Sequence, residues 1–220
     1  MKGKTITLIG ATGLIGSHLL ELLQNDDYYE RIKILVRKPV SFNHPKIQVV
    51  VIDFSDEEAY KSGISGSDAV FCAIGTTNNK VKGDKEAYRK VDYDIPVNAA
   101  KFCSETGCSQ FLLVSSVGAN SKSNNFYIRL KGEVEDRVRS INIPMVSVFR
   151  PSMLLGKRQE FRLGEIMAKA MMVPVSFLIP PMYRPIKAFD VAKSMVAASK
   201  KDTPGFHIYH YKEMKNILEV

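Results

Sequence analysis

The sequence predicts an α/β protein built on a doubly wound parallel sheet in a single domain. Apolar segments and amphipathic segments alternate from one end of the 220-residue chain to the other. Several of the apolar segments are continuous runs, which is typical of strands covered on both faces. The first apolar run leads directly into a glycine-rich turn and an amphipathic helix, the opening unit of many such sheets. At 45% hydrophobic and 25% charged residues, the composition is ordinary for one globular domain.

Each segment has a boundary that the sequence explains. Strands are expected at residues 5–9, 32–37, 47–52, 69–74, 111–115 and 145–149, with helices at 14–24, 56–61, 85–106 and 127–140. Gly107 is expected to cap the end of one helix, and Pro96 to kink or break it.

The pattern loosens after residue 149, where prolines punctuate residues 150–187. We expect this stretch to form the substrate side of the domain, with one helix at 164–172 and a lid or pocket wall at 158–172. Asp190 is then expected to cap a helix at 191–200. A strand at 206–209 and a helix at 212–218 complete the predicted domain, which spans residues 1–220.

The strongest functional signal is the glycine-rich turn after the first strand, Leu8-Ile9-Gly10-Ala11-Thr12-Gly13-Leu14-Ile15-Gly16-Ser17. Glycine allows close backbone approach, and the first helical turn presents free N–H groups to an anion. We therefore expect a dinucleotide pyrophosphate here; the competing interpretation is a purely structural turn. The expected contacts come from Gly10, Thr12, Gly13, Leu14, Ile15 and Gly16.

The ends of the next strands carry further candidates. Arg37, beside Lys38, lies 21 residues after Gly16, where an arginine accommodates the 2′-phosphate of NADP and an acid would bind the ribose of NAD. NADP(H) is therefore expected in preference to NAD(H), although a plain surface charge would look the same. Asp53 and Phe54 are candidates for the adenine, with a simple loop aspartate as the alternative. Gly75, Thr76 and Thr77 are expected to let the cofactor lie against bare backbone.

A tyrosine and a lysine four residues apart share one face of a helix, which suits proton donation by a phenol beside an ammonium. Four pairs have this spacing, but only Tyr127 and Lys131 follow the fifth strand and its serine pair. Both are also expected to contact the cofactor, the lysine at the nicotinamide ribose. Ser116 is expected to position a substrate carbonyl, and Ser115 to lie on the cofactor side. Two serines at a strand end are also common turn formers.

These motifs together resemble the short-chain dehydrogenase/reductase superfamily, in its atypical branch. The longer strings Phe71-Cys72-Ala73-Ile74-Gly75-Thr76-Thr77, Lys131-Gly132-Glu133-Val134-Glu135 and Ser147-Val148-Phe149-Arg150-Pro151 are similar to the Tat-interacting-protein oxidoreductases. The resemblance implies a Rossmann fold with bound NADP(H), and we expect Arg150, Pro151 and Ser152 to contact that cofactor. The 11 residues from Ser116 to Tyr127 are a shorter interval than most of the superfamily shows.

Three functions remain open at this stage. The leading hypothesis is an NADP(H)-dependent oxidoreductase acting on a small carbonyl or sugar-like substrate. The second is an NADPH-binding regulator that binds a protein partner without turnover. An epimerase or dehydratase is the third, disfavoured because such enzymes usually carry a larger C-terminal lobe.

Composition argues against several other classes. The net charge of +8 is scattered and interrupted by acids, so we expect no nucleic-acid partner. No stretch approaches the roughly 20 apolar residues of a membrane span, and we expect no signal peptide from the first residues. The three cysteines fit no metal spacing. A reducing, cytoplasmic location is expected from this cysteine usage.

Overall fold

A computed structural model describes residues 3–77, 81–156 and 180–219. Its centre is a seven-stranded sheet with the order β3-β2-β1-β4-β5-β6-β9, and every pairing is parallel. The strands are β1 (Lys4–Ile9), β2 (Tyr29–Val36), β3 (Ile47–Val51), β4 (Ala69–Cys72), β5 (Gln110–Val114), β6 (Met145–Phe149) and β9 (Gly205–Tyr209). The expected doubly wound, Rossmann-type sheet is confirmed.

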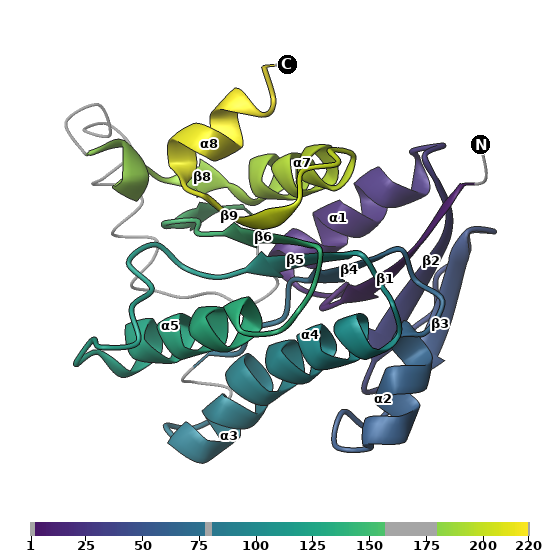
Figure 1. The fold of residues 1–220 in the computed structure, drawn as a ribbon, viewed down its shortest axis with the longest axis horizontal. Helices are drawn as coiled ribbons and strands as arrows, with labels where there is room; N and C mark the ends of the chain where they lie inside the picture. The colour runs from purple at the N-terminus through teal and green to yellow at the C-terminus, as the bar shows by residue number, and fades with distance from the viewer. Residues whose placement is uncertain (1–2, 78–80, 157–179, 220) are drawn as a thin grey trace.

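Helices cover both faces of the sheet, as Figure 1 shows. On one face α1 (Leu14–Gln24), α7 (Ala188–Ser199) and α8 (Tyr211–Asn216) pack against a shared apolar core. On the other face lie α2 (Glu57–Ile64), α4 (Ile95–Glu105) and α5 (Phe126–Arg139), with a second core beneath them. This double cover explains the continuous apolar strands of the sequence.

The strand ends are aligned by register at the carboxyl edge of the sheet. Ile9 pairs with Leu35 on one side and with Cys72 on the other, and the register continues from Cys72 to Leu113 and from Leu113 to Val148. The loops after these strands therefore leave the sheet at the same edge. The strand order reverses between β1 and β4, which is where such sheets bind their ligands.

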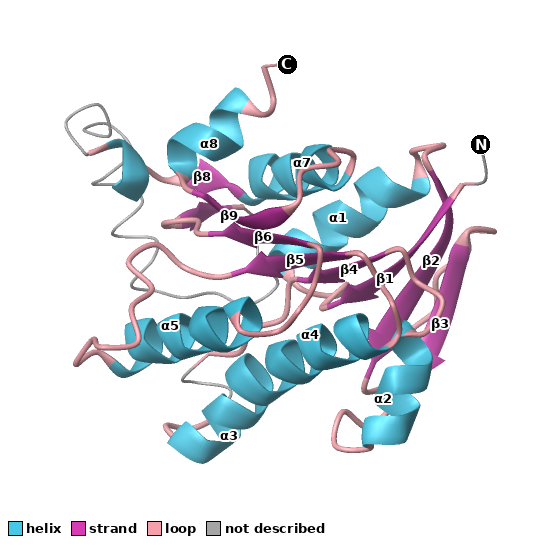
Figure 2. Cartoon of the chain, viewed as in Figure 1, coloured by secondary structure: helices cyan, strands magenta, loops and turns pink. Residues whose placement is uncertain are grey.

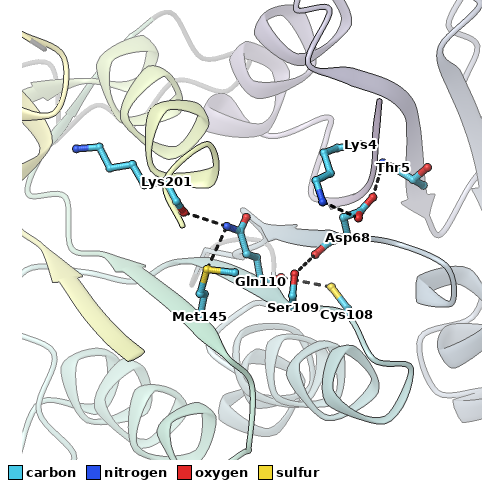
Figure 3. Close-up of polar contacts among 8 residues, drawn as sticks. All are labelled: Lys4, Thr5, Asp68, Cys108, Ser109, Gln110, Met145 and Lys201. Atoms are coloured by element: carbon cyan, nitrogen blue, oxygen red, sulfur yellow. Dashed lines mark hydrogen bonds and ion pairs between the residues drawn. The ribbon is translucent and has the colours of Figure 1, made fainter. Parts of the chain in front are cut away.

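The amino edge of the sheet is held by polar contacts that anchor the strand starts (Figure 3). Lys4 pairs with Asp68 at 3.0 Å, and the other oxygen of that carboxylate accepts the Thr5 amide. Gln110 donates to the Lys201 carbonyl at 3.2 Å, and Ser109 donates to the Asp68 carbonyl. These contacts join the starts of β1, β4 and β5 to the end of α7, away from the carboxyl edge.

The structure revises the predicted segment 85–106. It consists of α3 (Lys85–Arg89), a π-helical turn η1 (Lys90–Asp94) and α4, with Pro96 in the first turn of α4. Proline is tolerated there because the first amides of a helix have no intrahelical acceptor. The interruption therefore precedes Pro96, and the widened turn supplies it.

The expected cap at Asp190 is wrong. Helix α7 begins at Ala188, directly after strand β8 (Ile186–Lys187), and Asp190 lies in its first turn. There its carboxylate accepts from Lys215 at 2.7 Å. Acids are favoured in a first turn as well as at a cap, so the residue type alone did not fix the start.

Part of the predicted substrate side is described. It contains the short strands β7 (Leu154–Leu155) and β8, which pair in parallel, and the 3₁₀ turn η3 (Pro181–Tyr183). The helix expected at 164–172 and the pocket wall expected at 158–172 lie outside the described residues. Strand β8 leads into α7 (Figure 2), and η3 packs against α8. Within the described ranges, no helix has the length and apolar character to cross a membrane.

Candidate functional site at the carboxyl edge

The turn between β1 and α1 leaves no room for side chains at two of its glycines. Gly10 has a φ of +90°, and a Cβ there would lie 2.7 Å from the Ala73 backbone. A Cβ on Gly16 would lie 1.9 Å from the Gly10 carbonyl oxygen. The amide of Gly13 donates to that same oxygen at 2.9 Å and closes the turn. Both positions require glycine, since the chain crosses itself and strand β4 at close range.

The same turn offers backbone N–H groups and positive potential to an anion. Thr12 and Gly13 are exposed, whereas the Ile15 side chain is buried in the core. The first helical amides of α1 have no intrahelical acceptor, and the helix dipole adds positive potential there. A pyrophosphate fits this cradle of backbone donors, in which a Cβ at Gly10 or Gly16 would collide with the chain itself.

The candidates after β2 and β3 lie at the same edge. Arg37 and Lys38 are exposed directly after β2, the neighbour of β1. Asp53 is exposed, and its carboxylate accepts the Ser55 amide at 2.9 Å; the hydrogen bonds from Ser55 lower the pKa of Asp53. Phe54 packs edge-on against Tyr60, with ring centres 4.8 Å apart, so its ring supports the core beneath the loop.

A buried ion pair joins α5 to η1, which in turn contacts the loop after β4. Lys131 donates to Asp92 with an Nζ–Oδ1 distance of 2.9 Å, and their side chains are 7% and 1% exposed. The second oxygen of Asp92 accepts the Thr76 amide at 2.7 Å. A Cβ on Gly75 would lie 3.4 Å from Asp92 Oδ1, so the loop after β4 runs close against this carboxylate.

Tyr127 stands beside this pair on α5. The Lys131 Nζ lies 5.9 Å from the centre of the Tyr127 ring, and Tyr127 is 37% exposed. Tyr88 of α3 packs edge-on against that ring and donates to the Thr76 carbonyl at 3.3 Å. Burial is the largest single influence on the pKa of Lys131 and acts to lower it, but the charge of Asp92, Tyr127, the hydrogen bond to Asp92 and Tyr88 together hold that pKa above its ordinary value. The tyrosine therefore has a charged ammonium as its neighbour.

Ser115 and Arg150 meet in a separate buried cluster around Glu135. Ser115 donates to the Glu135 carboxylate, and the Arg150 guanidinium binds the same group at 3.0 and 2.5 Å. The three come from the end of β5, from α5 and from the residue after β6. Their mutual hydrogen bonds tie α5 to the sheet, and a direct cofactor contact by Ser115 or Arg150 stays a prediction.

The serine loop after β5 is fixed by backbone contacts. Val117 donates to the Pro151 carbonyl at 2.9 Å, and Ser152 donates to the Arg184 carbonyl. Ser116, half-buried, points its hydroxyl at the Val117 carbonyl at 3.3 Å. A Cβ on Gly132 would lie 2.1 Å from the Ser121 amide nitrogen, so α5 needs glycine there to lie against this loop.

Sequence reasoning missed Asp92 and Glu135. Both are acids on helices, where exposed acids are common, and only their burial distinguishes them. For Glu135 a signal was present, because it ends the string that begins at Lys131. Asp92 lies on the widened turn η1, which no local pattern announced.

Comparison with known proteins places the chain in a family. A sequence family described as NAD(P)H-binding matches residues 10–160. The chain belongs to this family. Protein HTATIP2 of Rattus norvegicus is 33% identical over 172 residues, which cover 77% of this chain and 70% of that protein. Protein FMP52, mitochondrial, of Candida albicans is 32% identical over 204 residues, covering 90% and 89%. Membership in the atypical short-chain dehydrogenase/reductases is thereby confirmed.

Solved structures support the same fold. A UDP-N-acetylglucosamine 4-epimerase from Methanobrevibacter ruminantium aligns with a TM-score of 0.72 at 16% identity, covering 96% of this chain and 77% of its own. MoeE5, solved with UDP-glucuronic acid and NAD, aligns with a TM-score of 0.74 at 13% identity, covering 94% and 76%. At these identities the likeness concerns the fold.

The cytoplasmic location expected from cysteine usage is corrected by the relatives. FMP52 proteins of Candida albicans, Debaryomyces hansenii and other fungi are named as mitochondrial. Free cysteines, as found at Cys72, Cys103 and Cys108, indicate a reducing environment and do not separate one such compartment from another. In the described part of the chain, no group of three His, Cys, Asp or Glu side chains is placed to hold a metal ion.

Proposed function

We propose that this protein is an NADP(H)-dependent oxidoreductase that reduces a small carbonyl or sugar-like substrate, with Tyr127 as the proton donor. The observation that carries the proposal is the position of Tyr127 and Lys131. Both lie on one face of α5, and the lysine is tied through Asp92 to the Thr76 backbone. The pair therefore adjoins the loop after β4, next to the glycine turn, where a dinucleotide binds in such sheets.

When bound, the nicotinamide supplies the hydride. The protein's task is to hold the substrate and to neutralise the alkoxide that forms as hydride arrives. The Tyr127 hydroxyl gives its proton to that oxygen, and the Lys131 ammonium stabilises the resulting phenolate. Ser116 is half-buried in the loop after β5, and its hydroxyl is proposed to donate to the substrate oxygen before transfer.

The finer proposal is a preference for NADP(H). Arg37 and Lys38 lie exposed after β2, where the 2′-phosphate of the adenosine ribose would lie. A charge-assisted contact of this kind predicts a loss of roughly tenfold to a hundredfold in NADPH affinity for Arg37→Ala, with NADH affinity unchanged. Arg31→Ala is the matched control, since Arg31 is an exposed arginine near the amino end of the same strand. Equal affinity of the wild type for NADPH and NADH, by calorimetry, would contradict the preference.

A second candidate is an NADPH-binding regulator that binds a protein partner without turnover. One observation favours it: Lys131 directs its ammonium to Asp92 and lies 5.9 Å from the ring centre of Tyr127. An enzyme of the proposed kind needs that ammonium to act on the phenolate as well.

Turnover separates the two candidates. We would follow NADPH oxidation by the wild-type protein against a panel of aldehydes, ketones and sugar nucleotides. The proposal expects saturable oxidation with at least one class. Intact NADPH binding with no oxidation by any member of the panel would favour the regulator.

A further inference from the structure

Asp92 is buried, and a buried carboxylate is unusual unless it is paired with a cation or hydrogen-bonded. It is 1% exposed and lies on η1, the π-helical turn between α3 and α4. Turns of this kind are rare and recur at functional sites, because the extra residue shifts the side chains that follow it. Here both carboxylate oxygens are engaged, one by the Lys131 ammonium and one by the Thr76 amide.

A lysine that is buried without a neighbouring negative charge tends to lose its proton. Moving an ammonium out of water disfavours its charged form, and buried lysines without a carboxylate titrate well below their usual range. This chain contains such a case. Lys33 is 9% exposed and donates to the Ser65 carbonyl, and burial lowers its pKa. Lys131 is at least as buried, yet its pKa is raised.

We propose that Asp92 is the positioning residue of this site, holding Lys131 in place and in its charged form beside Tyr127. The role of Asp92 toward Lys131 is argued from the buried ion pair and the Thr76 contact and does not depend on the proposed function. Its consequence for turnover rests on the proposed function. Asp92 would not touch the substrate; it would act through the lysine.

The other groups around the pair do not replace Asp92. Tyr88 of α3 and Tyr127 of α5 are phenols, and Cys72 of β4 is held as a thiol because burial raises its pKa to about 12. The other buried carboxylate on α5, Glu135, is engaged by Ser115 and Arg150. Among the described residues, Asp92 is the carboxylate that contacts Lys131.

Loss of the Asp92 charge would therefore change Tyr127 indirectly. With Lys131 neutral, a phenolate at Tyr127 loses its neighbouring cation and becomes less stable. For alcohol oxidation, in which the phenolate is the base, the rise of kcat/KM with pH would move to higher pH.

The test compares Asp92→Asn with Asp94→Asn by NMR of protein labelled at the lysine side-chain nitrogen. Asp94 lies on the same turn but is exposed, so its substitution removes the same charge from the surface. The Lys131 signal is assigned by its loss in Lys131→Arg. We expect Asp92→Asn to lower the Lys131 titration midpoint by at least about two pH units, and Asp94→Asn to leave it in place. An unchanged midpoint in folded Asp92→Asn would overturn the proposal.

The wild-type protein provides a second arm if Asp92→Asn does not fold. Lys131 must then titrate above the exposed lysines and Lys33 below them. Titration of Lys131 at or below the exposed lysines would overturn the proposal without any variant. Neither arm uses a substrate, so a failure to find turnover would count against the proposed function alone. Once a substrate is known, an unshifted pH profile in Asp92→Asn would refute the consequence for Tyr127.

Discussion

Lys33 and Lys131 are both buried, and they differ in the partner that the fold supplies. Lys33 of β2 donates to the carbonyl of Ser65, the residue that ends α2. Lys131 of α5 receives the full charge of Asp92. The end of a helix offers only a partial negative charge, worth a fraction of a carboxylate. Burial consequently lowers the pKa of Lys33, whereas at Lys131 the charge and hydrogen bond of Asp92, with Tyr127 and Tyr88, together exceed the effect of burial and keep that pKa raised.

The difference separates a structural lysine from a functional candidate. Lys33 belongs to a polar row across the sheet, in register with Thr7 of β1 and Gln48 of β3. A buried ion pair is weak evidence for stability, because apolar residues of similar volume often serve as well. The Asp92–Lys131 pair is therefore better explained by what it presents to Tyr127 than by what it adds to folding.

The largest effect is expected from Lys131→Met, which leaves Asp92 buried without its cation. Breaking a buried pair in this way costs about 3–5 kcal/mol, measured as the free energy of unfolding in urea. The double variant Lys131→Met/Asp92→Asn is the control, because the amide still accepts from Thr76 and no charge remains. It should recover most of the loss. A decrease in unfolding free energy of less than about 1 kcal/mol for Lys131→Met would show that Lys131 and Lys33 do not differ in this way.

Lys33→Met should change stability by less than about 1 kcal/mol at neutral pH, since it leaves no unpaired charge. The sign of its pH dependence is specific. The folded-state pKa of Lys33 is lowered, so the unfolded chain binds more protons between that value and the ordinary 10.5, and stability rises with pH across this window. The difference in unfolding free energy between wild type and Lys33→Met should follow that rise. A difference that is flat from pH 7 to about 10 would show that Lys33 is not desolvated.

The sequence was sufficient for the sheet and for the glycine-rich turn between β1 and α1. Continuous apolar runs marked strands covered on both faces, and β6 and α1 have the predicted bounds. Gly10 and Gly16 made the turn recognisable from sequence, because only glycine fits at these positions. A Cβ at either one would collide with backbone atoms, which cannot move aside as a side chain could. The helix expected at 56–61 extends to Ile64, since Gly63 packs against Leu35 and does not end it.

The polar arrangement of the site could not be predicted in the same way. Asp92 meets Thr76 and Lys131, which lie 16 residues before it and 39 residues after it, and nothing local sets those distances. Ser115 was expected on the cofactor side, and its hydroxyl goes to Glu135. Such contacts depend on how α4 and α5 pack side by side, which is a property of the assembled core.

Turnover by Tyr127→Phe tests the central claim most directly, with NADPH oxidation and NADPH affinity measured on the same preparations. The variant removes only the donated proton, so activity should fall about 10²–10⁴-fold while NADPH affinity stays within about threefold. Tyr211→Phe is the matched control, because Tyr211 and Lys215 have the same spacing on α8, on the opposite face of the sheet. It should retain wild-type activity. Full activity in Tyr127→Phe would show that this tyrosine is not the proton donor and would contradict the account.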